Sequence, residues 1–283
     1  MSIRNFVPTV WSAKLFSELD KAHVLVPLAN RDYEGEITNY GDQVKINAIG
    51  DIAVNNYAPN VTQITPQQLA AAQTVLEIDQ AKYFAFYIDD VDNAQTKPKV
   101  MSEAMRKSAY ALSDDTDQHI ASLVGFAGSV VASTAANIVN SVSVISQVAR
   151  ALDDRNVPSQ GRWMVIPPWF HQKLVLNQIF QTAGSVDANQ TYANGYVGRA
   201  FGFDFYLSNN LTTGPVVPAA TPLNCHSAMA GINRAISFAE QVVKMEAYRP
   251  ENSFSDAVKG LHVYGAKVID PSALARVNIA SSS

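Results

Sequence analysis

The stretch that decides the fold is PKVMSEAMRKSAYALSDDTDQHIASLVG, which runs from Pro98 to Gly125. Its apolar and small side chains recur every three or four residues, the spacing that places them on one face of a helix. Pro98 suits the first turn of a helix, and Gly125 suits a left-handed residue that ends one. About 26 helical residues would make a rod about 39 Å long, well beyond the usual helix of a globular domain. We therefore expect this helix to be the spine of the molecule.

Two stretches before the spine alternate apolar and polar residues, as strands with one covered face do. The first is YGDQVKINAIG, residues 40–50, and the second covers residues 74–90. In the second, one face would carry Leu76, Ile78, Phe84, Phe86 and Ile88. The polar pair Gln80 and Lys82 interrupts that face and indicates a bend or a change of neighbour.

The residues between these strands, 50–73, are rich in Asn, Gln, Ala and Thr and show no clear period. An isolated two-stranded hairpin is at best marginally stable in water. Its apolar face must therefore be covered, either by a larger sheet of the same chain or by another copy of the protein. Few other strands are expected nearby, so the sequence favours another copy.

After the spine, short helices and strands alternate, which predicts an α/β unit between residues 127 and 235. We expect a helix over 142–153, a strand over 162–166, a helix from Pro167 and a strand over 203–207. The helix from Pro167 would turn inward its residues Phe170, Leu174 and Val175. Two further strands, 241–248 and 261–269, would be joined by a second protruding hairpin. A short amphipathic helix is expected over residues 11–22.

Composition excludes several classes of function. The chain has 283 residues, 47% of them hydrophobic, and a formal net charge of −4 without any run of Lys or Arg, which argues against a nucleic-acid-binding surface. Cys225 is the single cysteine, so an intrachain disulfide and a thiolate metal cluster are excluded. The sequence shows neither a signal peptide nor an apolar run of 18 residues, so we expect a soluble intracellular chain.

Acidic clusters offer one catalytic alternative, a Mg²⁺-dependent enzyme. They lie at residues 89–92, 114–117 and 153–154, with DDxD rather than DDxxD spacing. Turn chemistry and an exposed helix face explain them more simply. The histidines show neither HxH nor HxxxH spacing, and the phosphate-loop, dinucleotide and serine-elbow motifs are absent from the sequence. We therefore expect a protein without catalytic residues, bound metal or cofactor.

The order of these elements, together with four stretches, resembles the major capsid proteins of tailed bacteriophages, which share the fold named after phage Hong Kong 97. The first stretch combines FVPTVWSAKLFSELDKAHVLVPLANRDYEGEI with YGDQVKIN, between Phe6 and Asn47. The others are IDQAKYFAFYIDDVD (Ile78–Asp92), GRAFGFDFYLSNNL (Gly198–Leu211) and FSDAVKGLHVYGAKVIDPSAL (Phe254–Leu274). Together they span nearly the whole chain in the order found in the family.

The resemblance implies an α+β fold of the Hong Kong 97 type. Residues 1–33 would form an N-terminal arm, and 34–91 an extended hairpin called the E-loop with its base. A peripheral P-domain would hold the spine helix within 92–127. An axial α/β A-domain would occupy 128–235, and 236–283 would return to the P-domain as strands and a C-terminal segment.

The resemblance also implies a function: assembly of many copies, as hexamers and pentamers, into the icosahedral head that encloses double-stranded DNA. Expected partners are a portal, scaffolding or decoration proteins, and DNA bound without sequence specificity, with no membrane. The protein would be assembled in the host cytoplasm and reside in the virion. An encapsulin-type cellular compartment, which shares the fold, is the alternative. Candidate intersubunit contacts lie at the two hairpin tips: Asn55, Tyr57, Val61, Ile64, Arg249, Glu251 and Phe254.

Overall fold

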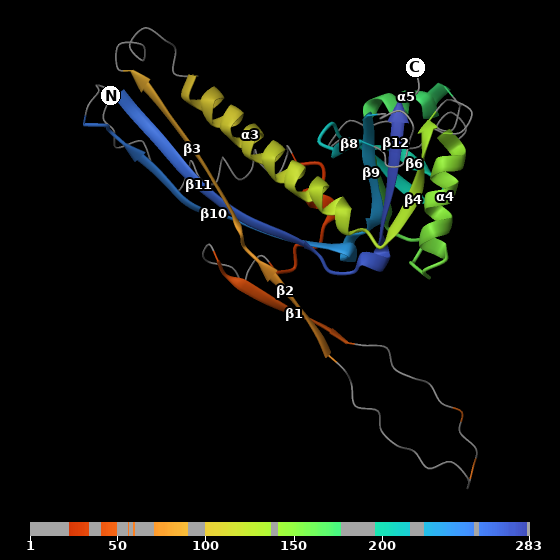
Figure 1. Ribbon diagram of the computed structural model, residues 1–283. Helices are drawn as coiled ribbons and strands as arrows, with labels where there is room; N and C mark the ends of the chain where they lie inside the picture. The colour runs from red at the N-terminus through yellow and green to blue at the C-terminus, as the bar shows by residue number, and fades with distance from the viewer. Residues whose placement is uncertain are drawn as a thin grey trace.

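The computed structural model describes residues 23–33, 41–49, 56, 59, 71–89, 100–136, 141–176, 196–215, 224–251 and 255–281. The short helix expected over residues 11–22 lies outside them. The chain forms two bodies (Figure 1): a long, narrow sheet with one helix along it, and a wider sheet flanked by two helices.

The spine helix is present as α3, Val100–Ser122. Its buried side chains recur along one face, as the spacing predicts: Met105, Ala109, Leu112, Thr116 and Ile120. The predicted end is wrong in one respect. The chain passes from α3 into a single 3₁₀ turn, η4 (Leu123–Phe126), and Gly125 lies inside this turn without a left-handed backbone.

The narrow sheet has three antiparallel strands in the order β10-β11-β3, namely Ile236–Tyr248, Ser255–Val268 and Gln80–Asp89. Helix α3 covers one face of it (Figure 1). Between helix and sheet lies a small apolar cluster made of Met105, Ala109, Met245 and Val258, against which Phe84 and Phe86 pack. Strands β10 and β11 are longer than the sequence predicts. Strand β10 begins at Ile236, before the predicted residue 241, and β11 begins at Ser255, inside the supposed second hairpin.

The hairpin before the spine pairs β1 (Gln43–Ile49) with β2 (Ala71–Glu77) in an antiparallel two-stranded sheet. The single strand predicted over 74–90 is therefore wrong: it is two strands, β2 and β3, in different sheets. Leu76 and Ile78 pack with Val263 and Ala239, whereas Phe84 and Phe86 pack toward α3. The break falls between Glu77 and Gln80, at the polar interruption from which the sequence indicates a change of neighbour.

The wider sheet has seven strands in the order β4-β12-β9-β5-β7-β6, with β8 also paired to β9. The strands are β4 Ser129–Ala136, β5 Arg162–Ile166, β6 Tyr196–Ala200, β7 Phe203–Leu207, β8 Thr213–Pro215, β9 Asn224–Ile232 and β12 Leu274–Ser281. Pairing is parallel for β12 with β4 and for β5 with β7, and antiparallel elsewhere. Strand β12 brings the C-terminal segment into this sheet.

Two helices accompany the wider sheet: α4 (Ser141–Asp153) and α5 (Pro168–Leu176). Helix α4 matches the predicted 142–153, and in α5 Phe170 and Leu174 are buried as expected. Val175 is instead exposed, so its predicted inward position is wrong. The sequence pattern does not predict strands β4, β6, β8, β9 and β12.

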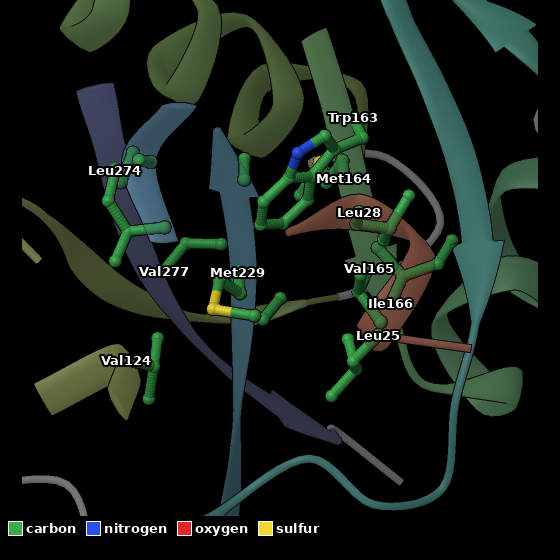
Figure 2. Close-up of a cluster of buried hydrophobic side chains, with 14 of the residues drawn as sticks. Leu25, Leu28, Val124, Trp163, Met164, Val165, Ile166, Met229, Leu274 and Val277 are labelled. Atoms are coloured by element: carbon green, nitrogen blue, oxygen red, sulfur yellow. The ribbon is translucent and has the colours of Figure 1, made fainter. Parts of the chain in front are cut away.

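The main core lies against the wider sheet and extends to the N-terminal part of the described chain. Residues 23–33, which we call the anchor segment, contain one 3₁₀ turn, η2 (Val26–Leu28). Leu25 and Leu28 from this segment lie beside Val165 and Ile166 of β5 (Figure 2), and all four are buried in the same cluster. Short turns η5 (Asn233–Ala235) and η6 (Pro271–Ala273) carry the chain between the two sheets.

Candidate assembly interface

The base of the β1–β2 hairpin crosses one end of the narrow sheet, on the face opposite α3. Val263 and Ala239 of the sheet form an apolar cluster with Val44, Ile46, Leu76 and Ile78 of the hairpin base. The backbone of β2 passes directly over Gly265, where a Cβ would lie 2.2 Å from the carbonyl oxygen of Glu77. Lys267 Nζ donates to the Val75 carbonyl oxygen at 2.7 Å. The hairpin is therefore fixed to its own sheet at the base. The expectation that another copy covers the hairpin's apolar face is wrong for this base, because the chain's own strands β10 and β11 cover it.

The other end of the same face is open and aromatic. Tyr83 is 79% exposed, Tyr87 71% and Tyr248 46%, and Leu261 is 37% exposed. In the sheet register Tyr83 pairs with Leu261, and Ala257 lies between Tyr87 and Tyr248. Residues paired directly opposite one another point to the same face, so these side chains form one surface. We call it the tyrosine face.

One ion pair lies within this surface, in the row between Tyr83 and Tyr87. Lys259 Nζ lies 2.8 Å from Glu246 Oε2 and 5.2 Å from the centre of the Tyr248 ring. The hydrogen bond with Glu246 raises the pKa of Lys259. Tyrosines that combine a large apolar ring with a polar hydroxyl are enriched in protein interfaces. The tyrosine face thus has the composition of an interface, with aromatic rings on either side of one ion pair.

On the opposite face of the sheet, Asp115 of α3 joins the helix to both neighbouring strands. Its carboxylate lies 3.0 Å from Lys82 Nζ on β3 and accepts a 2.6 Å hydrogen bond from the Tyr264 hydroxyl on β11. Desolvation raises the pKa of Asp115, but the hydrogen bonds from Tyr264 and Lys82 outweigh it and lower the pKa overall. Burial and the same carboxylate raise the pKa of Tyr264. These contacts hold the spine at a fixed position on the sheet.

Of the intersubunit residues proposed from the sequence, Arg249 and Glu251 lie just after β10 and are exposed. The other five, Asn55, Tyr57, Val61, Ile64 and Phe254, lie outside the described residues. Sequence reasoning missed the tyrosine face, although a signal was present. In KYFAFYI, Tyr83 and Tyr87 alternate with Phe84 and Phe86, so both faces of one strand carry aromatic residues.

The three aspartates of the cluster at 114–117 each contact a different set of partners. Asp114 accepts from Asn210 and Gln118, Asp115 contacts Lys82 and Tyr264, and Asp117 accepts from the backbone of Val24 and Leu25. Within the described part of the chain, no group of His, Cys, Asp and Glu side chains could hold a metal ion. Among the same residues, no helix is long and apolar enough to cross a membrane.

A hairpin fixed at its base, an open aromatic sheet face and acidic side chains engaged in structural contacts define a structural protein that associates through extended surfaces. The sequence comparison specifies which kind. The chain belongs to the phage capsid protein family, whose model matches residues 71–277. It is a major capsid protein of the tailed-phage head, a structural component of the virion rather than an enzyme.

Solved structures agree with this assignment. The chain is similar to a protein of Mycobacterium phage Che8, with 27% identity, a TM-score of 0.70 and 90% of each chain covered. It is also similar to the capsid structure of the cyanophage P-SCSP1u, with 20% identity, a TM-score of 0.65 and 93% and 88% coverage.

The capsid of Ralstonia phage GP4 matches with 11% identity, a TM-score of 0.69 and 90% and 87% coverage. Likeness at this level of identity shows the fold, which confirms the α+β architecture of the Hong Kong 97 type. A search of curated protein sequences finds no significant match.

Proposed function

We propose that many copies of this chain assemble as hexamers and pentamers into an icosahedral shell around double-stranded DNA, and that the hairpin of one copy lies on the tyrosine face of the next. The observation that carries this proposal is the half-covered sheet. The chain's own hairpin base covers the end near Val263, and Tyr83, Tyr87 and Leu261 at the other end stay open.

The domain division that the capsid resemblance implies is part of the same proposal. The arm would be 1–33, the E-loop with its base 34–91, the P-domain 92–127 and 236–283, and the A-domain 128–235. The sheet topology supports one refinement of this division, since β12 pairs with β4 and β9 and so belongs with the A-domain sheet. Hairpin-tip contacts through Asn55, Tyr57, Val61 and Ile64, and through Arg249, Glu251 and Phe254, remain part of the proposal.

Further partners belong to the proposal as well. A portal, scaffolding or decoration proteins and packaged DNA are those that the capsid resemblance implies. The formal net charge of −4 favours a wall that does not adsorb DNA strongly, because like charges repel at short range. The encapsulin-type compartment shares the fold, but the match to a phage capsid family favours the phage head.

A double substitution, Tyr83→Ser with Tyr87→Ser, tests the interface. Buried aromatic anchors commonly contribute about 2 kcal/mol or more to an interface, about 30-fold in the dissociation constant of each contact. We expect closed shells to disappear in negative-stain microscopy and sedimentation velocity, with an unchanged circular dichroism spectrum. Tyr110→Ser is the matched control, because Tyr110 is 66% exposed but lies on α3.

Two results would count against the interface. The first is normal shell formation by the double variant, and the second is an equal loss of shells in the Tyr110→Ser control. The second result would mean that any exposed tyrosine affects assembly, and the tyrosine face would lose its special role.

A further inference from the structure

The anchor segment contacts α3, β10 and β11 through a buried cluster of ionisable side chains. His23 and Arg31 come from the segment itself, Asp117 from α3, Glu240 from β10 and His262 from β11. The side chains of His23, Asp117, Glu240 and His262 are at most 3% exposed, and that of Arg31 is 30% exposed. Ionisable groups are rarely buried to this extent unless they are paired.

The Asp117 carboxylate accepts hydrogen bonds from the backbone at the start of the segment. The backbone N–H of Val24 donates to its Oδ2 at 2.9 Å, and that of Leu25 donates to its Oδ1 at 3.2 Å. His23 Nδ1 lies 3.5 Å from the same carboxylate and 3.0 Å from Ser113 Oγ. The carboxylate therefore depends on the docked segment for its hydrogen-bond donors.

The Glu240 carboxylate contacts side chains from both ends of the segment. Arg31 Nη2 lies 3.1 Å from its Oε1, and His23 Nε2 lies 3.8 Å from its Oε2. His262 Nε2 lies 3.0 Å from the same Oε2. Among the residues that the structure describes, His23 Nε2 and His262 Nδ1 have no hydrogen-bond partner.

A second set of ionisable groups borders the cluster on β11 and α3. The His262 ring lies 5.2 Å from the Tyr264 ring, and Tyr264 donates to Asp115, which pairs with Lys82 of β3. The His119 ring packs edge-on against Tyr264. These groups contact one another, and the anchor segment itself brings Arg31 and His23 to Glu240.

If the segment leaves, the two carboxylates lose most of their partners. Burying an ionised carboxylate without a partner is strongly unfavourable, so the group takes up a proton or draws in water. We propose that docking of the anchor segment is linked to protons: the segment is held while Glu240 is ionised, and its release is coupled to proton uptake by Glu240.

The sign of the pH dependence follows from Glu240. Desolvation would raise its pKa, but the hydrogen bond with His262 and the charges of His23, His262 and Arg31 outweigh it and lower the pKa. A group whose pKa is lowered on docking stabilises the docked state above its undocked pKa. That contribution is lost as pH falls through the docked pKa. The equilibrium constant for release of the anchor segment should therefore rise as pH falls through this acidic range. The rise should be up to about tenfold per pH unit for each proton taken up.

Hydrogen exchange of the full chain between pH 3.5 and 7.5, corrected for intrinsic rates, measures this opening. The informative amides are those of Val24 and Leu25, which donate to Asp117, and of Asn30, which donates to the Ile236 carbonyl oxygen. Amides of β12 report global unfolding at each pH. We expect anchor-segment protection to fall at acidic pH while protection in β12 persists.

Glu240→Gln should raise exchange of the anchor segment at neutral pH and flatten its pH dependence. Glu103→Gln is the matched control, because it removes an exposed carboxylate from the surface pair with Arg106, and it should leave the profile unchanged. A Glu240→Gln profile as steep as that of the parent would overturn the proposal.

A second variant covers the case in which Glu240→Gln does not fold. Arg31→Met removes one cation and leaves the carboxylates in place, so the acidic loss of protection should move to higher pH. A transition at the parental pH would overturn the proposal. A merely structural role for Arg31 would lower protection equally at every pH.

Discussion

Substitution of Gly265 by alanine tests how the hairpin is attached to the narrow sheet. An ideal Cβ at this position would lie 2.2 Å from the carbonyl oxygen of Glu77 and 3.0 Å from the Cα of Ile78. Ordinary carbon–oxygen contacts lie near 3.3–3.6 Å, so the backbone of β2 would have to move by roughly 1 Å. A flexible side chain could turn aside, but a backbone carbonyl in a paired strand cannot do so without moving the strand.

The expected cost is that of an overpacked contact, about 1–3 kcal/mol in the free energy of unfolding. At about 2–4 °C per kcal/mol for a domain of 150–250 residues, the Tm should fall by about 2–12 °C. Because the hairpin base determines where the hairpin leaves the sheet, its displacement should also lower shell yield. Thermal unfolding by circular dichroism and sedimentation velocity of the same preparation measure the two effects.

Gly125→Ala is the matched control. It adds the same methyl group at a site where no atom lies within 4 Å of the new Cβ and the backbone is not left-handed. Its unfolding free energy should stay within about 0.5 kcal/mol of the parent. If Gly265→Ala were as stable and as competent in assembly as Gly125→Ala, β2 would not cross the sheet as described.

Two further predictions concern stability. Phe205→Ala should lower the free energy of unfolding by about 3–5 kcal/mol in a denaturant titration, because Phe205 is fully buried in the main core, and Phe201→Ala at a half-exposed ring should cost far less. Asp115→Asn should weaken the acid sensitivity of unfolding. Because the pKa of Asp115 is lowered in the folded chain, its ionised carboxylate stabilises the fold above the ordinary carboxyl pKa. This stabilisation is lost as pH falls through the lowered pKa. Partial exposure of Asp115 keeps the effect below about 1 kcal/mol. An unchanged pH profile in the Asn variant would contradict this role.

The parts of the fold that the sequence predicts are those with a strong local period. Helix α4 buries Val144, Ile145, Val148 and Leu152 along one stripe, and that spacing is visible in the sequence. The spine helix is likewise apparent from its periodicity. Strand β5 is short, every residue in it is buried, and after Arg162 it is an apolar run, which the sequence also identifies.

Other strands could not be found in this way, because local spacing does not encode them. Strands β4 (SVVASTAA), β9 (NCHSAMAGI) and β12 (LARVNIAS) are rich in Ala and Ser. Small residues fit tightly between neighbouring strands, but they give little alternation and have no strong strand preference. At Gly231, for example, a Cβ would lie 2.8 Å from the Ala273 carbonyl oxygen. Such strands are specified by their neighbours.

The candidate sites depend on tertiary contacts even more strongly. Arg31 and Glu240 are separated by 209 residues, so no spacing rule connects them. The division of residues 74–90 into two strands also depends on which sheet each half joins. For the tyrosine face, the aromatic alternation around Tyr83 and Tyr87 is a local sign of an interface.

The central claim is that this chain leaves an aromatic sheet face open and that another copy covers it. Electron cryo-microscopy of particles assembled from the purified chain tests it most directly. We predict closed shells in which density from a neighbouring subunit's hairpin lies over Tyr83, Tyr87 and Leu261. Shells in which these side chains face solvent in every subunit, or a chain that stays monomeric with its own hairpin folded over them, would contradict the claim.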